Sequence, residues 1–60
     1  MPYINVKLAG SLSKEQKKEI AKEITDTMQR IAHKPPSYTY IVFDEVEMED
    51  WAIAGQLLGS

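Results

Sequence analysis

Pro2 is the residue in this sequence whose position gives it unusual chemistry. A small residue after the initiator methionine favours removal of Met1, and removal exposes a secondary amine held within the proline ring. An apolar pocket near other positive charges disfavours the charged form of such an amine and lowers its pKa. An amine that is neutral near pH 7 is a good general base for moving a proton to and from carbon. Pro2 is therefore the candidate catalytic residue, provided that Met1 is removed.

The residue types that other common catalytic and metal sites require are scarce. The sequence has no cysteine and one histidine, His33, so thiolate metal sites and catalytic sets built on cysteine or paired histidines are not expected. It also lacks a glycine-rich phosphate loop. The acidic stretch 45–50 could supply acid–base carboxylates or hold a cation, but its spacing fits no calcium-binding loop, and we interpret it as solvated. We expect a site with no metal and no cofactor.

Composition favours a small soluble protein. The 60 residues carry a net charge of −2, with 27% charged residues spread along the chain. No basic face stands out, which argues against nucleic acid as a partner. No apolar run approaches the roughly 20 residues of a membrane span, and polar residues interrupt the N-terminal segment, unlike a secretory signal. We therefore expect no nucleic-acid or membrane partner, and a cytoplasmic location.

Two elements must position Pro2. Residues 2–8 alternate between apolar and other side chains, which predicts a strand. Ser13 and Gln16 have the spacing of a capping box at the start of a helix. Apolar residues then recur at helical spacing, at Ile20, Ile24, Met28 and Ile31. The prolines at 35–36 end this helix, because the residue before a proline is disfavoured in the helical conformation.

The second half of the chain predicts another strand and a less regular end. Residues 37–43 are rich in β-branched and aromatic types, as strands are. Residues 45–60 predict a loop followed by a short strand or hairpin. Strand, helix and strand form a βαβ unit with parallel strands and a right-handed crossover. We expect the α/β (α+β) class and one domain over residues 1–60.

A single βαβ unit cannot complete a core. Its helix covers one face of the two-stranded sheet and leaves the other face and both edges open, and such a sheet is not independently stable in water. Chains of this length usually add disulfides, a metal or a partner subunit. Since cysteine is absent, we expect a homo-oligomer.

Several features together carry a family resemblance. Pro2 opens a short strand, Gly10 lies in the following turn, residues 13–17 start the helix, and Trp51 precedes the small-residue segment 52–55. Nearly the whole chain thus resembles the 4-oxalocrotonate tautomerase family of the tautomerase superfamily. The resemblance implies a tautomerase-like (macrophage migration inhibitory factor-like) fold and a homohexamer, a trimer of dimers in which neighbouring subunits contribute to each site. It also implies a cofactor-free isomerase that moves a proton between an enol and a keto acid.

Two arginines of the family are missing. Family members that act on dicarboxylates use one arginine in the turn after the first strand and one inside the second strand. Counted from Pro2, these positions are Leu12 and Tyr40, and neither side chain pairs with a carboxylate. Arg30 falls late in the helix, where we interpret it as a surface residue. The resemblance therefore implies a monocarboxylate or aryl substrate instead of a dicarboxylate.

Three further residues are candidates for substrate binding. Residues 34–38 resemble the Lys-Pro-Pro-x-Tyr segment of macrophage migration inhibitory factor, whose lysine holds the carboxylate of an aryl pyruvate. The resemblance assigns that role to Lys34, although a cation near a helix C-terminus is also favoured by the helix dipole. Tyr40 could donate a hydrogen bond to an enolate oxygen and form an aromatic wall with Trp51. The alternative for both aromatic residues is packing at an oligomer interface.

Other residues near Pro2 receive weaker interpretations. We interpret Tyr3 and Tyr38 as packing residues. Lys7 could lower the pKa of the Pro2 amine, but we favour a solvated strand lysine.

The main hypothesis is a cofactor-free keto–enol tautomerase that acts on a 2-oxo or enol acid. Pro2 is its base, Lys34 binds the substrate carboxylate, and Tyr40 and Trp51 enclose an apolar or aromatic group. The alternative is a catalytically weak or inactive binding subunit, or one chain of a mixed tautomerase assembly. Dehalogenation or decarboxylation by the same proline ranks lower, since these reactions need the cationic anchoring that the missing arginines would supply.

Overall fold

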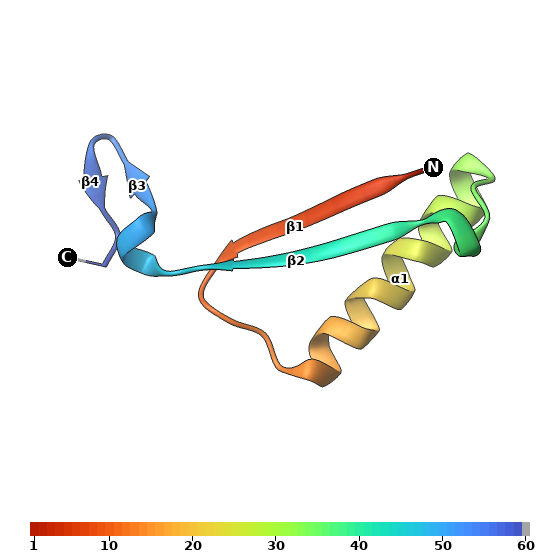
Figure 1. Cartoon of the computed structure of the whole chain (residues 1–60), viewed down its shortest axis with the longest axis horizontal. Coiled ribbons are helices and arrows are strands. Elements are labelled where there is room, and N and C mark those ends of the chain that lie inside the picture. Colours follow the sequence, from red (N-terminus) through yellow and green to blue (C-terminus); the bar gives the residue numbers. More distant parts are fainter. Residues whose placement is uncertain (60) are drawn as a thin grey trace.

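A parallel pair of strands joined through one long helix forms the main part of the molecule (Figure 1). The computed structural model describes residues 1–59. The elements in chain order are β1 (Tyr3–Ala9), α1 (Lys14–Ala32), the short 3₁₀ helix η1 (Pro36–Tyr38), β2 (Tyr40–Val46), the 3₁₀ helix η2 (Met48–Asp50), β3 (Ala52–Ile53) and β4 (Gln56–Leu57). The predicted βαβ unit with a C-terminal hairpin is confirmed.

The register of the sheet brings the starts of its two strands together. Tyr3 pairs with Tyr40 in the parallel ladder. The ladder continues past both ends, since the Tyr40 N–H donates to the Pro2 carbonyl at 3.0 Å and the Gly10 N–H donates to the Val46 carbonyl at 3.1 Å. Pro2 therefore lies beside the first residue of β2, although 38 positions separate the two in sequence.

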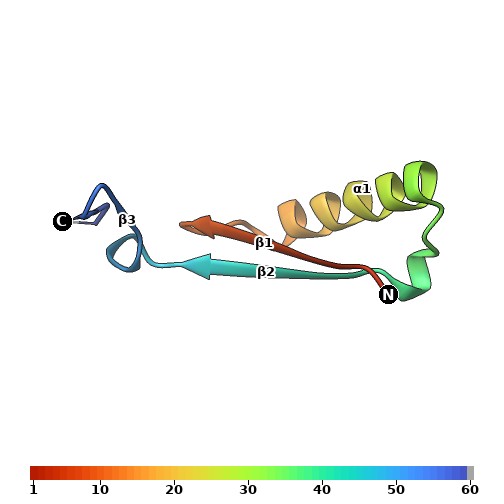
Figure 2. The ribbon, with the colours of Figure 1, turned by 90° about the horizontal axis from the view of Figure 1, so that it is seen from above.

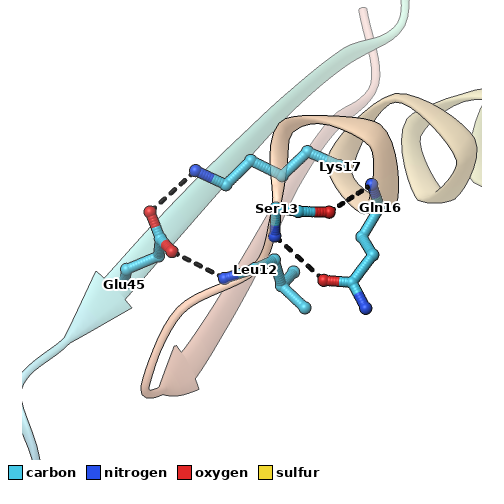
Figure 3. A network of polar contacts seen from close by, with 5 residues as sticks. All are labelled: Leu12, Ser13, Gln16, Lys17 and Glu45. Carbon is cyan, nitrogen blue, oxygen red and sulfur yellow. Dashed lines mark hydrogen bonds and ion pairs between the residues drawn. The ribbon is translucent and has the colours of Figure 1, made fainter.

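The helix α1 begins and ends with defined caps. The Ser13 hydroxyl accepts the Gln16 N–H at 3.1 Å, and the Gln16 side-chain oxygen accepts the Ser13 N–H at 2.9 Å, which confirms the capping box (Figure 3). At the other end His33 takes a left-handed conformation with φ of 57°, and the Lys34 N–H bonds to the Met28 carbonyl at 3.2 Å. This closing turn directs the chain away from the helix axis before the two prolines.

The helix α1 covers only one face of the sheet (Figure 2). An ion pair between Lys17 of α1 and Glu45 of β2 marks the covered face. The half-buried apolar side chains of that face are Ile4, Val6, Leu8, Ile41 and Phe43. On the opposite face, Tyr3, Tyr40 and Val42 remain 61%, 54% and 44% exposed.

Within residues 1–59, no side chain reaches full burial in the single chain. The apolar stripe of α1 is half-buried at Ile20, Ile24 and Met28, while Ile31 is 64% exposed. A protein core normally contains fully buried aliphatic and aromatic side chains. One copy of this chain therefore has an incomplete core, which agrees with the expected need for partner subunits.

The second strand differs from its predicted bounds of 37–43. Pro36–Tyr38 instead forms η1, and the Thr39 N–H donates to the Pro36 carbonyl at 3.2 Å, so the strand begins only at Tyr40. The strand also continues to Val46 and includes Glu45, which the sequence placed in a solvated loop. The prediction was wrong at both ends. The 3₁₀ turn after the two prolines delays the start of the strand, and pairing with β1 together with the contacts of Glu45 to Lys17 and Leu12 carries it through the acidic segment to Val46.

The C-terminal segment forms a tight hairpin of β3 and β4. Its two-residue turn, Ala54 and Gly55, has positive φ at both positions, 53° and 80°. Two positive φ values are typical of a type I′ turn, whose twist suits a β-hairpin. The Leu58 N–H donates to the Trp51 carbonyl at 2.8 Å, which holds the end of the hairpin beside the residue that begins it.

Candidate active site

Pro2 lies at the end of the sheet where β1 and β2 both begin (Figure 1). Its carbonyl accepts the Tyr40 N–H at 3.0 Å, so the sheet fixes its backbone, and its side chain is half-buried. Met1 is 86% exposed, which leaves the Met1–Pro2 bond accessible to a processing peptidase. While Met1 is attached, the Pro2 nitrogen is an amide without a basic lone pair. The sheet therefore fixes the backbone of the candidate base, while the exposed Met1 can still be removed to free the Pro2 amine.

Tyr40 lies directly beside Pro2, as its predicted role requires. It also faces Tyr3 in the register, and both rings lie on the open face of the sheet. The Tyr3 hydroxyl is 3.4 Å from the Asn5 side-chain amide nitrogen, which donates to it. The sequence alone suggested only a packing role for Tyr3. The parallel register shows that Tyr3 is a neighbour of Tyr40. The structure therefore places two exposed phenol rings at the end of the sheet that carries Pro2.

Lys34 lies in the connection between α1 and η1, at the end of the molecule that holds the N-terminus (Figure 1). Its backbone is held by the hydrogen bond from its N–H to Met28, and its side chain is exposed. In the described part of the chain, no carboxylate lies within ion-pair distance of its ammonium group. Lys34 thus offers an uncompensated positive charge on the same side of the molecule as Pro2.

Trp51 lies at the opposite end of the molecule. It follows η2 and precedes the hairpin, beyond the end of β2 (Figure 1). The seven residues of β2 alone span about 20 Å at the usual rise of a parallel strand. The longest dimension of the chain is 42 Å. Pro2, Lys34 and Tyr40 therefore gather at one end of a chain, whereas Trp51 of the same chain cannot reach them.

Lys7 forms an ion pair with Asp44 across the two strands. Five residues along β1 separate it from Pro2, a distance of about 16 Å. Its charge is compensated by the carboxylate as well. Lys7 of the same chain is therefore not a source of positive potential at Pro2. It is a solvated strand lysine, 51% exposed, that also pairs with Asp44.

Leu12, the position where the resemblance predicts the first arginine, takes part in a network of polar contacts around Glu45 (Figure 3). The Glu45 carboxylate accepts the Lys17 ammonium at 2.7 Å and the Leu12 N–H at 2.8 Å. The hydrogen bond from Lys17, and secondarily that from Leu12, lowers the pKa of Glu45 below its ordinary value of 4.5. The ionised carboxylate of Glu45 in β2 therefore binds the backbone of the turn after β1 at Leu12, the position where the resemblance predicts an arginine.

A cavity of about 290 Å³ lies beside this network. Its lining residues are Gly10, Ser11, Glu45, Val46 and Glu47. None of the predicted site residues contributes to it, and it lies where the strands end, away from Pro2. Among residues 1–59, no group of three or more histidine, aspartate or glutamate side chains is arranged to hold a metal ion. No helix in the same residues is long and apolar enough to cross a membrane.

Comparison with known proteins agrees with this architecture. A family model described as "Tautomerase enzyme" matches residues 2–60. A probable tautomerase of Ralstonia nicotianae is 37% identical over 59 residues, covering 98% of this chain and 91% of the relative. The crystal structure of a 4-oxalocrotonate tautomerase homologue superposes with a TM-score of 0.90 at 25% identity, over 100% of this chain and 95% of that one.

A further solved structure shares the fold. A 4-oxalocrotonate tautomerase from Chloroflexus aurantiacus, described as a heterohexamer, has a TM-score of 0.86 at 20% identity, over 100% of this chain and 97% of that one. The match of the family model over almost the whole chain, together with these relatives, confirms the resemblance to this family. The chain belongs to the tautomerase family and is a tautomerase of the 4-oxalocrotonate tautomerase type.

Proposed function

We propose that this tautomerase interconverts the keto and enol forms of a 2-oxo acid in the cytoplasm, without a cofactor, and that the Pro2 amine is its base. The observation that carries the proposal is the position of Pro2, whose carbonyl is fixed by the Tyr40 N–H while Met1 projects into solvent. The amine takes a proton from the enol hydroxyl or from the carbon next to the carbonyl. It then returns a proton to the other position, so that no atom is gained or lost.

The proposed substrate is a monocarboxylate with an apolar or aromatic group. The uncompensated Lys34 ammonium lies at the Pro2 end and can bind one carboxylate. Tyr40 can donate a hydrogen bond to the enolate oxygen as charge develops there. Neither Leu12 nor Tyr40, the two positions of the family's arginines, supplies a cation for a second carboxylate, and the Leu12 N–H is already bound to Glu45.

The proposed active form is a homo-oligomer, with a hexamer favoured. Trp51 can approach a Pro2 only from another copy, because its own Pro2 lies at the other end of the molecule. The absence of any fully buried residue in the described chain points the same way. A mixed assembly is the second candidate. It is favoured by the missing arginine positions, Leu12 and Tyr40, which a different partner chain could complement.

The test compares the wild type with Pro2→Ala after intact mass has established that Met1 is absent from both. We expect an aryl enolpyruvate to be ketonised by the wild type and turnover to fall about 100-fold or more in the variant, the range for losing a general base. Unchanged turnover would overturn the mechanism. An inactive wild type whose N-terminal amine titrates as an ordinary proline amine would favour the binding-subunit alternative.

A further inference from the structure

The connection between α1 and β2 (residues 33–39) carries Lys34 and has few means of being held in place (Figure 1). The two prolines at 35–36 directly follow Lys34 and have no N–H to donate. All of residues 29–40 are exposed except Thr39, which is half-buried. Packing therefore contributes little to the position of this connection, and hydrogen bonds to its backbone must supply most of it.

These hydrogen bonds converge on the Pro35 carbonyl. It accepts the Tyr38 N–H at 3.1 Å and the Thr39 hydroxyl at 3.1 Å. A carbonyl oxygen has two lone pairs, so both are used. The Thr39 N–H also donates to the Pro36 carbonyl at 3.2 Å. Among residues 1–59, the Thr39 hydroxyl is the one side-chain group that bonds to the backbone of this connection.

The bonds to the Pro35 carbonyl restrict the backbone of Lys34. The Lys34 N–H donates to the Met28 carbonyl at 3.2 Å, which ties this residue to the last turn of α1. The ring of Pro35 fixes its own φ, here −63°, and disfavours the helical conformation for the residue before it. The ψ of Pro35, 138°, remains free to rotate and sets the direction of its carbonyl. Holding that carbonyl therefore fixes the direction in which the chain leaves Lys34.

The other side of this hydrogen-bonded turn is joined to Pro2. Thr39 immediately precedes Tyr40, whose N–H donates to the Pro2 carbonyl at 3.0 Å. A short path thus runs from the Pro35 carbonyl through Thr39 to the backbone of Pro2. It connects the residue to which the proposed function assigns carboxylate binding with the residue to which it assigns proton transfer.

We propose that Thr39 is a positioning residue of this site, whose hydroxyl holds the Pro35 carbonyl and thereby fixes the backbone of Lys34 relative to Pro2. The inference rests on the proposed function, because it requires the Lys34 ammonium to bind the substrate carboxylate. Thr39 acts through Lys34 and not by contact with the substrate. When the connection is free to move, binding of the carboxylate must also order it, which weakens binding. Loss of the hydroxyl therefore raises KM without removing either the cation or the base.

The first test removes the hydroxyl and keeps the shape of the side chain. Thr39→Val retains the β-branch but lacks the donor, whereas Thr39→Ser retains the donor. We expect Thr39→Val to raise KM for an aryl enolpyruvate about fivefold, the size of one lost hydrogen bond, and Thr39→Ser to recover most of this loss. The methyl ester of the substrate, which lacks the carboxylate, should have the same KM in the wild type and in Thr39→Val. An equal rise for acid and ester, or no recovery in Thr39→Ser, would overturn the positioning role.

A double-mutant cycle separates positioning of Lys34 from a general effect on the fold. Thr39→Val should add no further rise in KM once Lys34 has been replaced by methionine. Additive effects of Lys34→Met and Thr39→Val would contradict the proposal. The matched control is Thr27→Val in α1, because the Thr27 hydroxyl also donates to the carbonyl four residues earlier, that of Glu23, at 2.9 Å. This control should leave KM unchanged.

A measurement without substrate distinguishes failure of this inference from failure of the proposed function. Backbone order parameters of the Lys34 and Ser37 amides are measured by nuclear magnetic resonance relaxation in the wild type, Thr39→Val and Thr27→Val. We expect both amides to become more mobile in Thr39→Val alone. Unchanged order parameters in that variant would overturn the inference whatever the activity of the enzyme. The expected loss of order in an enzyme that does not turn over the acid would support the role of Thr39 in holding the connection and count against the Pro2 mechanism.

Discussion

The ammonium of Lys17 and the carboxylate of Glu45 lie 2.7 Å apart, although 28 positions separate the two residues in sequence. The second carboxylate oxygen accepts the Leu12 N–H at 2.8 Å. One side chain of β2 therefore holds both the first turn of α1 and the turn that precedes it. This network fixes where α1 begins relative to the sheet, and hence where its far end places Lys34.

The Glu45 network predicts a loss of stability in acid. Hydrogen bonding lowers the pKa of Glu45 in the folded chain below 4.5, so its contribution is present above pH 4.5 and is lost as pH falls through the lower folded pKa. We expect Glu45→Gln to have a lower urea midpoint than the wild type at pH 7, and the difference to shrink below pH 4.5. Measurements are made at one protein concentration, because association shifts the midpoint.

The control for Glu45 is Glu23→Gln. The Glu23 carboxylate accepts no hydrogen bond from the described residues. Its substitution should change the midpoint less at pH 7. Equal effects of the two substitutions would contradict the role given to Glu45.

The hairpin turn predicts a stabilising substitution. Ala54 has φ of 53°, a conformation that costs a residue with a Cβ about 1 kcal/mol or more. Ala54→Gly should raise the thermal midpoint at fixed concentration, since glycine adopts this conformation without steric cost. The matched control is Ala52→Gly in β3, where glycine weakens the strand and should lower the midpoint. A decrease with Ala54→Gly would contradict the turn conformation.

The contact between Gly59 and η2 predicts a change at the tryptophan. A Cβ at Gly59 would lie 2.8 Å from the Glu49 backbone nitrogen and 3.1 Å from its Cα, too close for backbone atoms that cannot rotate away. Gly59→Ala should therefore displace the end of the hairpin, which is bonded to the Trp51 carbonyl through Leu58. We expect a shift in the emission of Trp51, the single tryptophan, and reduced turnover. An unchanged emission spectrum would contradict this packing.

The sequence predicted the elements well because their signals are local. The capping box, the helical spacing of the apolar stripe and the two prolines determined α1 closely. The bounds of β2 could not be predicted in the same way, since Glu45 enters the strand through contacts with Lys17 and Leu12 that are distant in sequence. The β-branched and aromatic residue types also predict a strand at residues 37–38, but in the structure the prolines impose a 3₁₀ turn there.

The candidate site was predictable only in part, for a related reason. Pro2 and Tyr40 lie side by side because the register of the parallel sheet aligns the starts of both strands, and Lys34 lies at the same end of the molecule, in the connection that leads into β2. The neighbour of Tyr40 on the open face, Tyr3, becomes visible only once that register is known. The remoteness of Trp51 likewise depends on the direction of β2, which no residue type encodes.

The Lys34 ammonium predicts which kinetic constant depends on the substrate carboxylate. Lys34 is exposed, has no ion-pair partner in the described chain and lies at the Pro2 end. If it binds the ground-state carboxylate as tightly as that of the transition state, its loss raises KM and leaves kcat nearly unchanged. We expect Lys34→Met to raise KM for an aryl enolpyruvate about tenfold, as loss of a charge-assisted hydrogen bond does, and Lys34→Arg to recover part of it. Lys18→Met is the control for removing a lysine charge. The methyl ester of the substrate lacks the carboxylate, so its KM should be the same for the wild type and for Lys34→Met. An equal KM for the acid in the wild type and in Lys34→Met would contradict this role. It would mean that the Lys34 charge instead stabilises the C-terminal end of α1, where the helix carbonyls are exposed.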